Sequence, residues 1–203
     1  MVRGAAFAQA GFAALTIVPA GEERFDLSSG ITTLPQGGQV VDAERNLMLT
    51  GSYIQHKEGE FVEAREVTLE GEFGTLLAES VRLDLAEDTL SAAEVSLTTG
   101  TLDVQATTLT LYLEPDIARL GGEVTSAVPA FEAATIVLAL ERGDSLLQSP
   151  YRFQDGPFTL QQTESGGMLY LHAERGENGE TFYNPSTTVP AELLEILRPY
   201  LTP

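Results

Sequence analysis

The chain has 203 residues and a formal net charge of −19, from 11 Lys and Arg against 30 Asp and Glu. Nucleic acids and anionic membrane surfaces attract clustered basic residues, so this balance argues against both as electrostatic partners. The length suits one domain or two small ones, and a 43% share of apolar residues is enough for a core, which argues against disorder.

The first 20 residues allow two interpretations. Arg3 precedes a mostly small, apolar stretch from Ala5 to Val18, and the Val18-Pro19-Ala20 ending is compatible with a signal peptide. The same stretch also follows the alternation found further along the chain, which favours a strand of the folded protein. We prefer the strand and keep the leader as the alternative. The stretch is too short for a membrane-spanning helix, which needs about 18 apolar residues or more.

From about Asp26 to His172 apolar and polar residues alternate in short runs, and these runs are separated by turn residues. This pattern is typical of strands rather than helices. The interruptions are rich in Gly, Asp, Glu and Pro, as expected for tight turns. The sequence therefore predicts an all-β domain over residues 1–184, with about 12–14 short antiparallel strands.

One frame recurs within this region: an apolar residue, any residue, Ala, two of any kind, apolar, any residue, apolar. Its alanines stand at 64, 78, 92 and 106, each 14 residues after the last, and a further one stands at 133. Side chains alternate faces along a strand, so the apolar residues before and after the alanine share one interior only if the strand bends between them. We expect each unit to be a strand with a corner, stacked into a folded-over sheet with an apolar interior.

The C-terminal segment, residues 185–203, is predicted to form an amphipathic helix. Leu193, Leu194 and Leu197 share an apolar face, and Pro190 suits a first helical turn. We expect this helix to cap one end of the sheet. Asn178-Gly179, in the polar stretch before it, is a typical hairpin turn.

Residues that carry catalysis are scarce. The chain has no cysteine, which excludes disulfides, thiolate chemistry and thiolate metal sites. His56 and His172 lie far apart without a metal-ligand pattern. Acidic pairs such as Glu87 and Asp88 fall in expected turns, where a solvated charge is the ordinary explanation. We expect no enzymatic activity, no metal and no cofactor.

The repeated frame resembles the signature of the OstA-like lipopolysaccharide-transport family, which includes LptA-like and LptC-like periplasmic proteins. The similarity rests on FVEAREVTL, LLAESVRLDL, LSAAEVSL, DVQATTLTLYL and FEAATIVLAL, together with RLGGEVTS and LMLTGSY, within about residues 38–172. The signature commonly has Asp after the alanine, whereas this chain has Arg65, Glu79, Ala93, Thr107 and Ala134. The chain also shows no anchoring helix of the kind that the membrane-anchored member carries.

The resemblance implies a twisted, V-shaped β-jellyroll in the periplasm or cell envelope, with an apolar groove that carries lipid acyl chains between membranes. It implies a transport component rather than an enzyme. Transferred to this sequence, the groove-lining positions are apolar residues of the frame: Val62, Val67, Leu69, Leu76, Val81, Leu83, Leu90, Val95, Leu97, Val104, Leu109, Leu111, Phe131, Ile136 and Leu138.

Two alternatives remain open from the sequence. The interior can be a packed core, and the protein a structural β-solenoid that assembles edge to edge, as bactofilin-like filaments do, without a ligand. The charge also bears on the ligand, because a protein of −19 repels the phosphates of a lipopolysaccharide core, which favours a neutral or zwitterionic lipid. The acids between the frame positions are expected on the outside of the sheet: Glu63, Glu66, Glu79, Asp84, Glu94 and Asp103.

Overall fold

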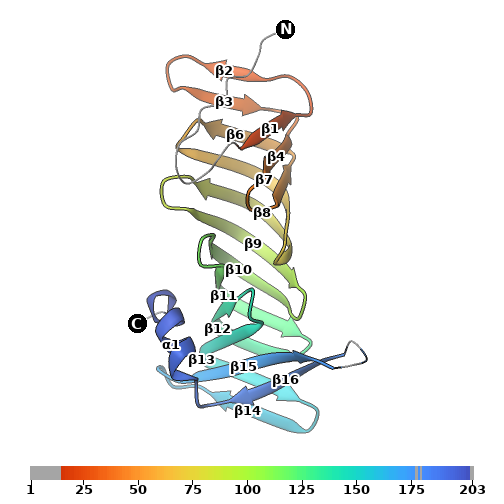
Figure 1. Ribbon diagram of the computed structural model, residues 1–203, viewed down its shortest axis with the longest axis vertical. Helices are drawn as coiled ribbons and strands as arrows, with labels where there is room; N and C mark the ends of the chain where they lie inside the picture. Colours follow the sequence, from red (N-terminus) through yellow and green to blue (C-terminus); the bar gives the residue numbers. More distant parts are fainter. Residues whose placement is uncertain (1–14, 177, 179, 202–203) are drawn as a thin grey trace.

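The computed structural model describes residues 15–176, 178 and 180–201. Sixteen strands and one short helix make up this part of the chain, which confirms the predicted all-β class (Figure 1). The strands are β1 Thr16–Pro19, β2 Arg24–Asp26, β3 Ile31–Leu34, β4 Gly38–Asp42, β5 Leu47–Gly51, β6 Tyr53–Lys57, β7 Phe61–Gly71, β8 Gly74–Asp84, β9 Thr89–Thr99, β10 Asp103–Tyr112, β11 Ile117–Ala127, β12 Ala130–Ala139, β13 Asp144–Asp155, β14 Phe158–Gln162, β15 Met168–Arg175 and β16 Thr181–Ser186.

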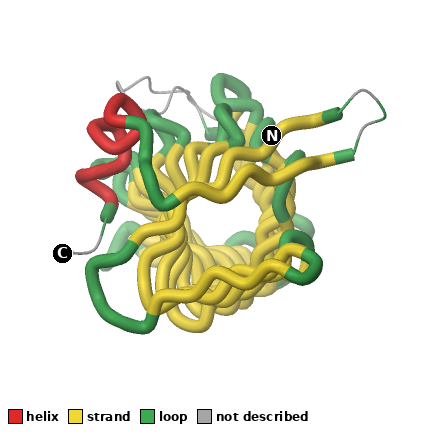
Figure 2. The backbone as a smooth tube through the Cα atoms, turned by 90° about the horizontal axis from the view of Figure 1, so that it is seen from below, coloured by secondary structure: helices red, strands yellow, loops and turns green. Residues whose placement is uncertain are grey.

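All described strands belong to one antiparallel sheet that folds over on itself, and Figure 2 shows the strands running around the long axis. Each long strand, β7 to β13, contributes to both walls of the fold. Wall A contains β2, β3, β6, β15, β16 and one end of each long strand, while wall B contains β1, β4, β5, β14 and the other end. The sequence is therefore correct about a V-shaped, folded-over sheet.

The predicted bend is present in the long strands. In β7, Ala64 and Val67 are both buried, and the two residues between them, Arg65 and Glu66, are both exposed. Glu66 has a φ of 48°, which lies in the left-handed region of backbone conformation. Residues other than Gly, Asn and Asp rarely adopt this conformation. Glu94 in β9 and Glu123 in β11 have φ values of 50° and 55°. This turn of the backbone redirects the alternation, so the apolar residues on both sides of the alanine face one interior.

The strand number exceeds the predicted 12–14 because some bent strands are interrupted at the corner. β5 and β6 both pair with β7, and they are separated by Ser52 alone. β14 and β15 both pair with β13 in the same manner. The strand expected before Pro19 corresponds to β1, which begins at Thr16. Residues 1–14 lie outside the described part of the chain. Gly179 of the expected hairpin turn also lies outside it.

A single apolar cluster fills the space between the walls. It extends from Leu34 to Leu171 and includes the alanines of the repeat at 64, 78, 92, 106 and 133. Near Leu49, Leu69 and Leu90, where the walls meet, a cavity of about 20 Å³ has room for about one water molecule, and a second of the same size lies near Leu102 and Leu138. The interior is therefore packed by side chains rather than hollow.

The helix α1, Ala191–Leu197, continues into a short 3-10 helix, Arg198–Tyr200. The sequence places this segment over one end of the sheet, whereas the structure places it on the outer face of wall A (Figure 1). Leu193 and Leu197 pack there on an apolar patch of Ile117, Val137 and Leu146. These three residues occupy the outward positions of their strands, so the helix covers apolar surface that the repeat leaves outside.

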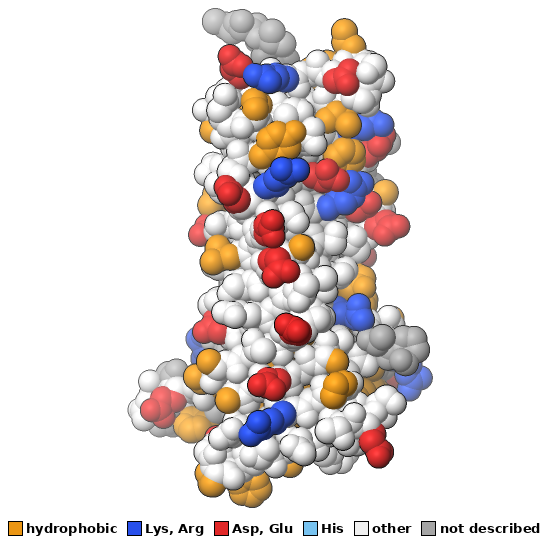
Figure 3. All heavy atoms as spheres, turned by 180° about the vertical axis from the view of Figure 1, so that it is seen from behind, with side chains coloured by type: hydrophobic (Ala, Val, Ile, Leu, Met, Phe, Trp, Pro, Cys, Tyr) orange, Lys and Arg blue, Asp and Glu red, His pale blue; other side chains and the backbone are white. Residues whose placement is uncertain are grey.

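The predicted location of the acids agrees with the structure. Of the six named from the sequence, Glu66, Glu79, Glu94 and Asp103 are exposed, while Glu63 and Asp84 are half-buried. Acidic side chains are spread along the length of the face in Figure 3, with a few basic ones between them. Charges spread in this way on the outside of a sheet disfavour nonspecific association of its unpaired edges.

Candidate functional site

A seam runs along the molecule where the outer ends of the two walls come together. Turns between strands border it on both sides. Those of wall A include residues 84–89, 112–117 and 139–144, and those of wall B include residues 42–47, 71–74 and 99–103. On the wall A side these turns are tied along the fold by backbone hydrogen bonds, from Leu113 N to Asp88 O and from Leu140 N to Asp116 O.

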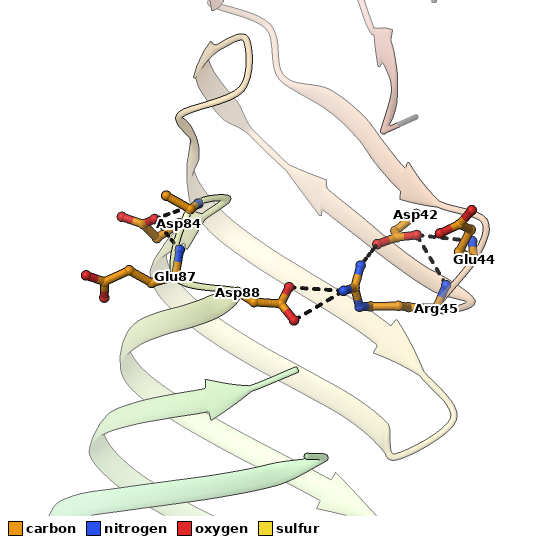
Figure 4. Close-up of polar contacts among 7 residues, drawn as sticks. Asp42, Glu44, Arg45, Asp84, Glu87 and Asp88 are labelled. Atoms are coloured by element: carbon orange, nitrogen blue, oxygen red, sulfur yellow. Dashed lines mark hydrogen bonds and ion pairs between the residues drawn. The ribbon is translucent and has the colours of Figure 1, made fainter. Parts of the chain in front are cut away.

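Near its N-terminal end the seam is closed by ion pairs, which we call the N-terminal clasp (Figure 4). Arg45, in the β4–β5 turn, reaches across to Asp88 in the β8–β9 turn, at 3.1 Å, and also pairs with Asp42 at 3.1 Å. The Asp42 carboxylate is buried and also accepts hydrogen bonds from the backbone N–H groups of Glu44 and Arg45. One guanidinium therefore joins the two walls through two carboxylates.

Toward the C-terminal end the seam is closed differently, by the β15–β16 hairpin, and we call this the C-terminal clasp. β15 continues past its pairing with β13, which ends at His172, and the hairpin extends to the turn between β9 and β10. Arg175 donates to the Gly100 carbonyl at 2.6 Å, and the Tyr183 hydroxyl donates to the Thr101 carbonyl. Burial is the main cause that raises the pKa of Tyr183, and the charge of Asp103 adds to it, so this hydroxyl stays a donor at neutral pH.

Between the two clasps lies a groove of about 970 Å³, which we call the seam groove. Its floor contains the apolar side chains of the lining, which are buried or half-buried, and its rim consists of charged and polar turn residues. Leu111 and Leu113 belong to the core cluster, and Leu47, Phe73 and Leu140 pack against it. The groove therefore gives solvent access to the edge of the apolar interior.

The positions predicted to line a lipid groove all lie inside the fold. All fifteen belong to the core cluster, with 0% to 6% of their surface exposed: Val62, Val67, Leu69, Leu76, Val81, Leu83, Leu90, Val95, Leu97, Val104, Leu109, Leu111, Phe131, Ile136 and Leu138. Only Leu111 among them also borders the seam groove. The structure thus brings the predicted set together as a packed core, and the open surface lies at its edge.

Four apolar residues of the groove floor lie outside the fifteen positions predicted from the sequence. Leu113 and Leu140 are the last apolar positions of their repeat units, directly before a turn, and this position was the available signal. Leu47 and Phe73 stand at wall B turns, outside the repeated frame. Their contribution depends on which turns face each other across the seam, and strand periodicity alone does not determine this.

The two histidines lie on different parts of the sheet. His56 is in β6, and burial lowers its pKa, against the opposing charges of Glu23 and Glu58. His172, in β15, hydrogen-bonds to the buried Asp144 through Nδ1 at 2.7 Å. Within the described ranges no three His, Asp or Glu side chains are arranged to hold a metal ion.

Asp144 anchors β13 to β15 on the outer face of wall A. Besides His172, its carboxylate accepts a hydrogen bond from the Tyr170 hydroxyl at 2.8 Å. Burial, followed by the bond to Asp144, raises the pKa of Tyr170 to about 12. Each partner of this carboxylate belongs to β15 or to the turn that holds Arg142, so the cluster supports strand pairing.

The comparisons with known proteins differ between sequence and structure. No family model matches the chain, and no curated protein matches it. Among solved structures the chain is similar to LptH from Pseudomonas aeruginosa, described as the LptA homologous periplasmic component of the conserved lipopolysaccharide transport device. The match has 11% identity and a TM-score of 0.48, and it covers 54% of this chain and 82% of LptH. No described helix is long and apolar enough to cross a membrane.

Proposed function

We propose that this protein is a non-enzymatic lipid-binding or transport component of the cell envelope, and that acyl chains bind it through the seam groove. The observation that carries the proposal is a groove on the seam that reaches the edge of one apolar core, where Leu47, Phe73 and Leu140 are half-buried. Its volume of about 970 Å³ lies at the upper end of the range of about 300–1,000 Å³ typical of ligand sites.

The physical basis is the burial of hydrocarbon. Each methylene removed from water contributes about 0.8 kcal/mol, so a chain on the floor of the groove binds without a catalytic or metal site. Because the interior is packed, a chain that enters between the walls has to displace core side chains such as Leu111 and Leu138. The predicted groove-lining residues are in this proposal the lining that forms when the walls separate, and the seam residues are the entrance.

The repeat supports an envelope location. Its apolar-x-Ala frame resembles that of the OstA-like family, which works in the periplasm. Partners in this setting are an envelope lipid and other envelope proteins, reached by strand addition at the ends of the sheet.

The experiment is native mass spectrometry of gently purified protein, combined with titration of a photo-crosslinkable fatty acid. We expect co-purifying lipid and crosslinks at the seam groove. Leu140→Asp places a charge on the floor and should abolish crosslinking, while Leu77→Asp, on the outer face of wall B with 50% of Leu77 exposed, should leave it unchanged. Circular dichroism verifies that both variants are folded. Absence of lipid and of crosslinks in the folded wild type would refute the proposal.

A second function, an edge-to-edge scaffold without ligand, is favoured by the packed interior and by the sheet edges. In the described part of the chain, β1, β2, β14 and β16 each pair with one strand only. Large apolar side chains are exposed near both ends of the sheet, with Leu27 at 90% near β2 and Phe158 at 71% in β14. Such edges pair with another chain head to tail.

Sedimentation velocity over a range of concentrations separates the two functions. A scaffold forms growing assemblies in the absence of lipid, and Phe158→Arg shortens them, whereas a lipid carrier binds the fatty acid as a monomer. Growth of assemblies without any fatty-acid binding would favour the scaffold.

A further inference from the structure

The rim of the seam groove carries an unequal set of charges. It has five carboxylates and three guanidiniums, from the turns on both sides of the seam: Glu44, Glu72, Glu114, Asp116 and Glu141, with Arg45, Arg142 and Arg175. Side-chain charges of both signs therefore face the groove, and their partners decide which sign a ligand meets.

Two of the three guanidiniums are paired with carboxylates outside this set of five. Arg45 is held by Asp42 and Asp88 in the N-terminal clasp. Arg142 pairs with Asp144, Nε to Oδ2, at 3.5 Å. Arg175 donates to a backbone carbonyl and keeps its net charge. Five carboxylates thus face one guanidinium that lacks a carboxylate partner, which makes the rim locally negative.

The carboxylates also repel one another across the seam. Partial burial raises the pKa of Asp116, and the charges of Glu141 and Glu72 raise it further, against the attraction of Arg45. Glu141 lies on the wall A side and Glu72 on the wall B side, so both sides act on one carboxyl group. Within the described residues, none of these three carboxylates has a hydrogen bond or ion pair with another side chain.

We propose that the seam groove selects amphiphiles with a cationic amine head, which Glu72, Asp116 and Glu141 hold while the hydrocarbon tail lies on the floor formed by Leu113 and Leu140. The inference rests on the proposed lipid-binding function and adds the class of head group to it. An amine donates hydrogen bonds to carboxylates from both sides of the seam and relieves their mutual repulsion. An anionic head such as a sulfate or a phosphate meets the same carboxylates as like charges.

The test uses three amphiphiles with the same tail and different heads: dodecylammonium, dodecyl sulfate and dodecyl maltoside, each below its micellar concentration. Isothermal titration calorimetry at low salt should show dodecylammonium binding at least about tenfold more tightly than dodecyl sulfate, with the maltoside between them. The preference should shrink as salt is added, since salt screens partly exposed charges.

Matched variants separate the groove from the overall charge. The double variant Glu72→Gln with Glu141→Gln should reduce the preference for the amine to about threefold or less and leave maltoside affinity unchanged. The control Glu79→Gln with Glu94→Gln makes the same charge change at the exposed bend and should keep the preference.

The outcomes distinguish the two levels of the proposal. If none of the three amphiphiles binds, the lipid-binding function itself is wrong. If all three bind equally, lipid binding stands and the head-group inference is overturned. An equal loss of preference in the groove variant and the control would also overturn it, since the net charge of the chain would then explain the selectivity.

Discussion

The packed interior and the seam hold the same two walls together by different means. The interior is a continuous apolar cluster, and its contribution to stability comes from burial along the whole fold. The seam is joined by a few polar contacts at two clasps, with a groove between them. This difference teaches that the seam and the interior resist opening differently, because opening the seam first breaks a few polar contacts, whereas separating the walls further also exposes the apolar core.

The two clasps differ in turn. The N-terminal clasp joins opposite charges, whereas the C-terminal clasp uses side-chain donors and backbone carbonyls. Ion pairs of partly exposed groups weaken in salt, and hydrogen bonds of a neutral hydroxyl do so much less. The comparison predicts a molecule whose seam opens more easily at its N-terminal end when salt is raised.

The largest expected effect is in the interior. Leu76 in β8 has 0% of its surface exposed, so Leu76→Ala should lower the free energy of unfolding by about 2–5 kcal/mol, through lost burial and the cavity left behind. Leu77 is the neighbour of Leu76 on the same strand and points outward, with 50% of its surface exposed. Leu77→Ala should therefore change the free energy of unfolding by less than about 1 kcal/mol. Urea denaturation of both variants measures the difference. Equal losses would show that the interior is loosely packed.

The same strand shows how far the sequence predicts the fold. The interval of 14 between Ala64 and Ala78 predicts which residues face inward, because the two-residue alternation and the bend constrain every unit equally. The repeat does not predict the candidate site in the same way. The groove depends on which turns approach each other across the seam, and on the path of the β15–β16 hairpin, where Tyr183 meets Thr101 from 82 residues away. Contacts between turns leave no periodic signal.

The position of α1 illustrates a second limit. Its amphipathic pattern predicts a helix with one apolar face, and the structure contains this helix. The pattern does not specify the surface that the helix covers. That surface exists because Val137 and Leu146 occupy outward positions in β12 and β13, in stretches too uniformly apolar to show which face is inside.

The next effect concerns the N-terminal clasp. Asp88→Asn removes the ion pair with Arg45 but keeps a residue that tolerates the φ of 54° at this position. We expect the free energy of unfolding to fall by about 1 kcal/mol at low salt and by less in 1 M salt. Glu87→Gln changes the same charge in the same turn, and its side chain is directed away from Arg45 (Figure 4), so it should have little effect. A loss independent of salt would contradict an electrostatic clasp.

The C-terminal clasp provides the matching test. Tyr183→Phe removes the hydroxyl that donates to the Thr101 carbonyl and keeps the ring, which packs against the core cluster. The free energy of unfolding should fall by about 0.5–1.5 kcal/mol, and this decrease should depend little on salt. Tyr53→Phe serves as the control, because no hydrogen bond of its hydroxyl is among those of the described residues. If Tyr183→Phe were as sensitive to salt as Asp88→Asn, the two clasps would not differ in kind.

The smallest effect is expected from the carboxylates of the groove, and it depends on pH. The folded protein raises the pKa of Asp116 above the unfolded value of 3.8, through burial and the charges of Glu141 and Glu72. The folded state therefore holds this proton more tightly than the unfolded state. The stability that this provides is complete below pH 3.8 and is lost as the pH rises through the raised pKa.

Asp116→Asn removes this titration and tolerates the φ of 51°. Relative to the wild type, the variant should gain stability as the pH rises from about 3 to 7, by less than about 0.5 kcal/mol because the site is partly solvated. Thermal unfolding of both proteins across this pH range measures the gain, with Glu79→Gln at the exposed bend as the control. A difference that does not change with pH would mean that the carboxylates of the groove do not interact, and the seam would then differ from the interior only in its polarity.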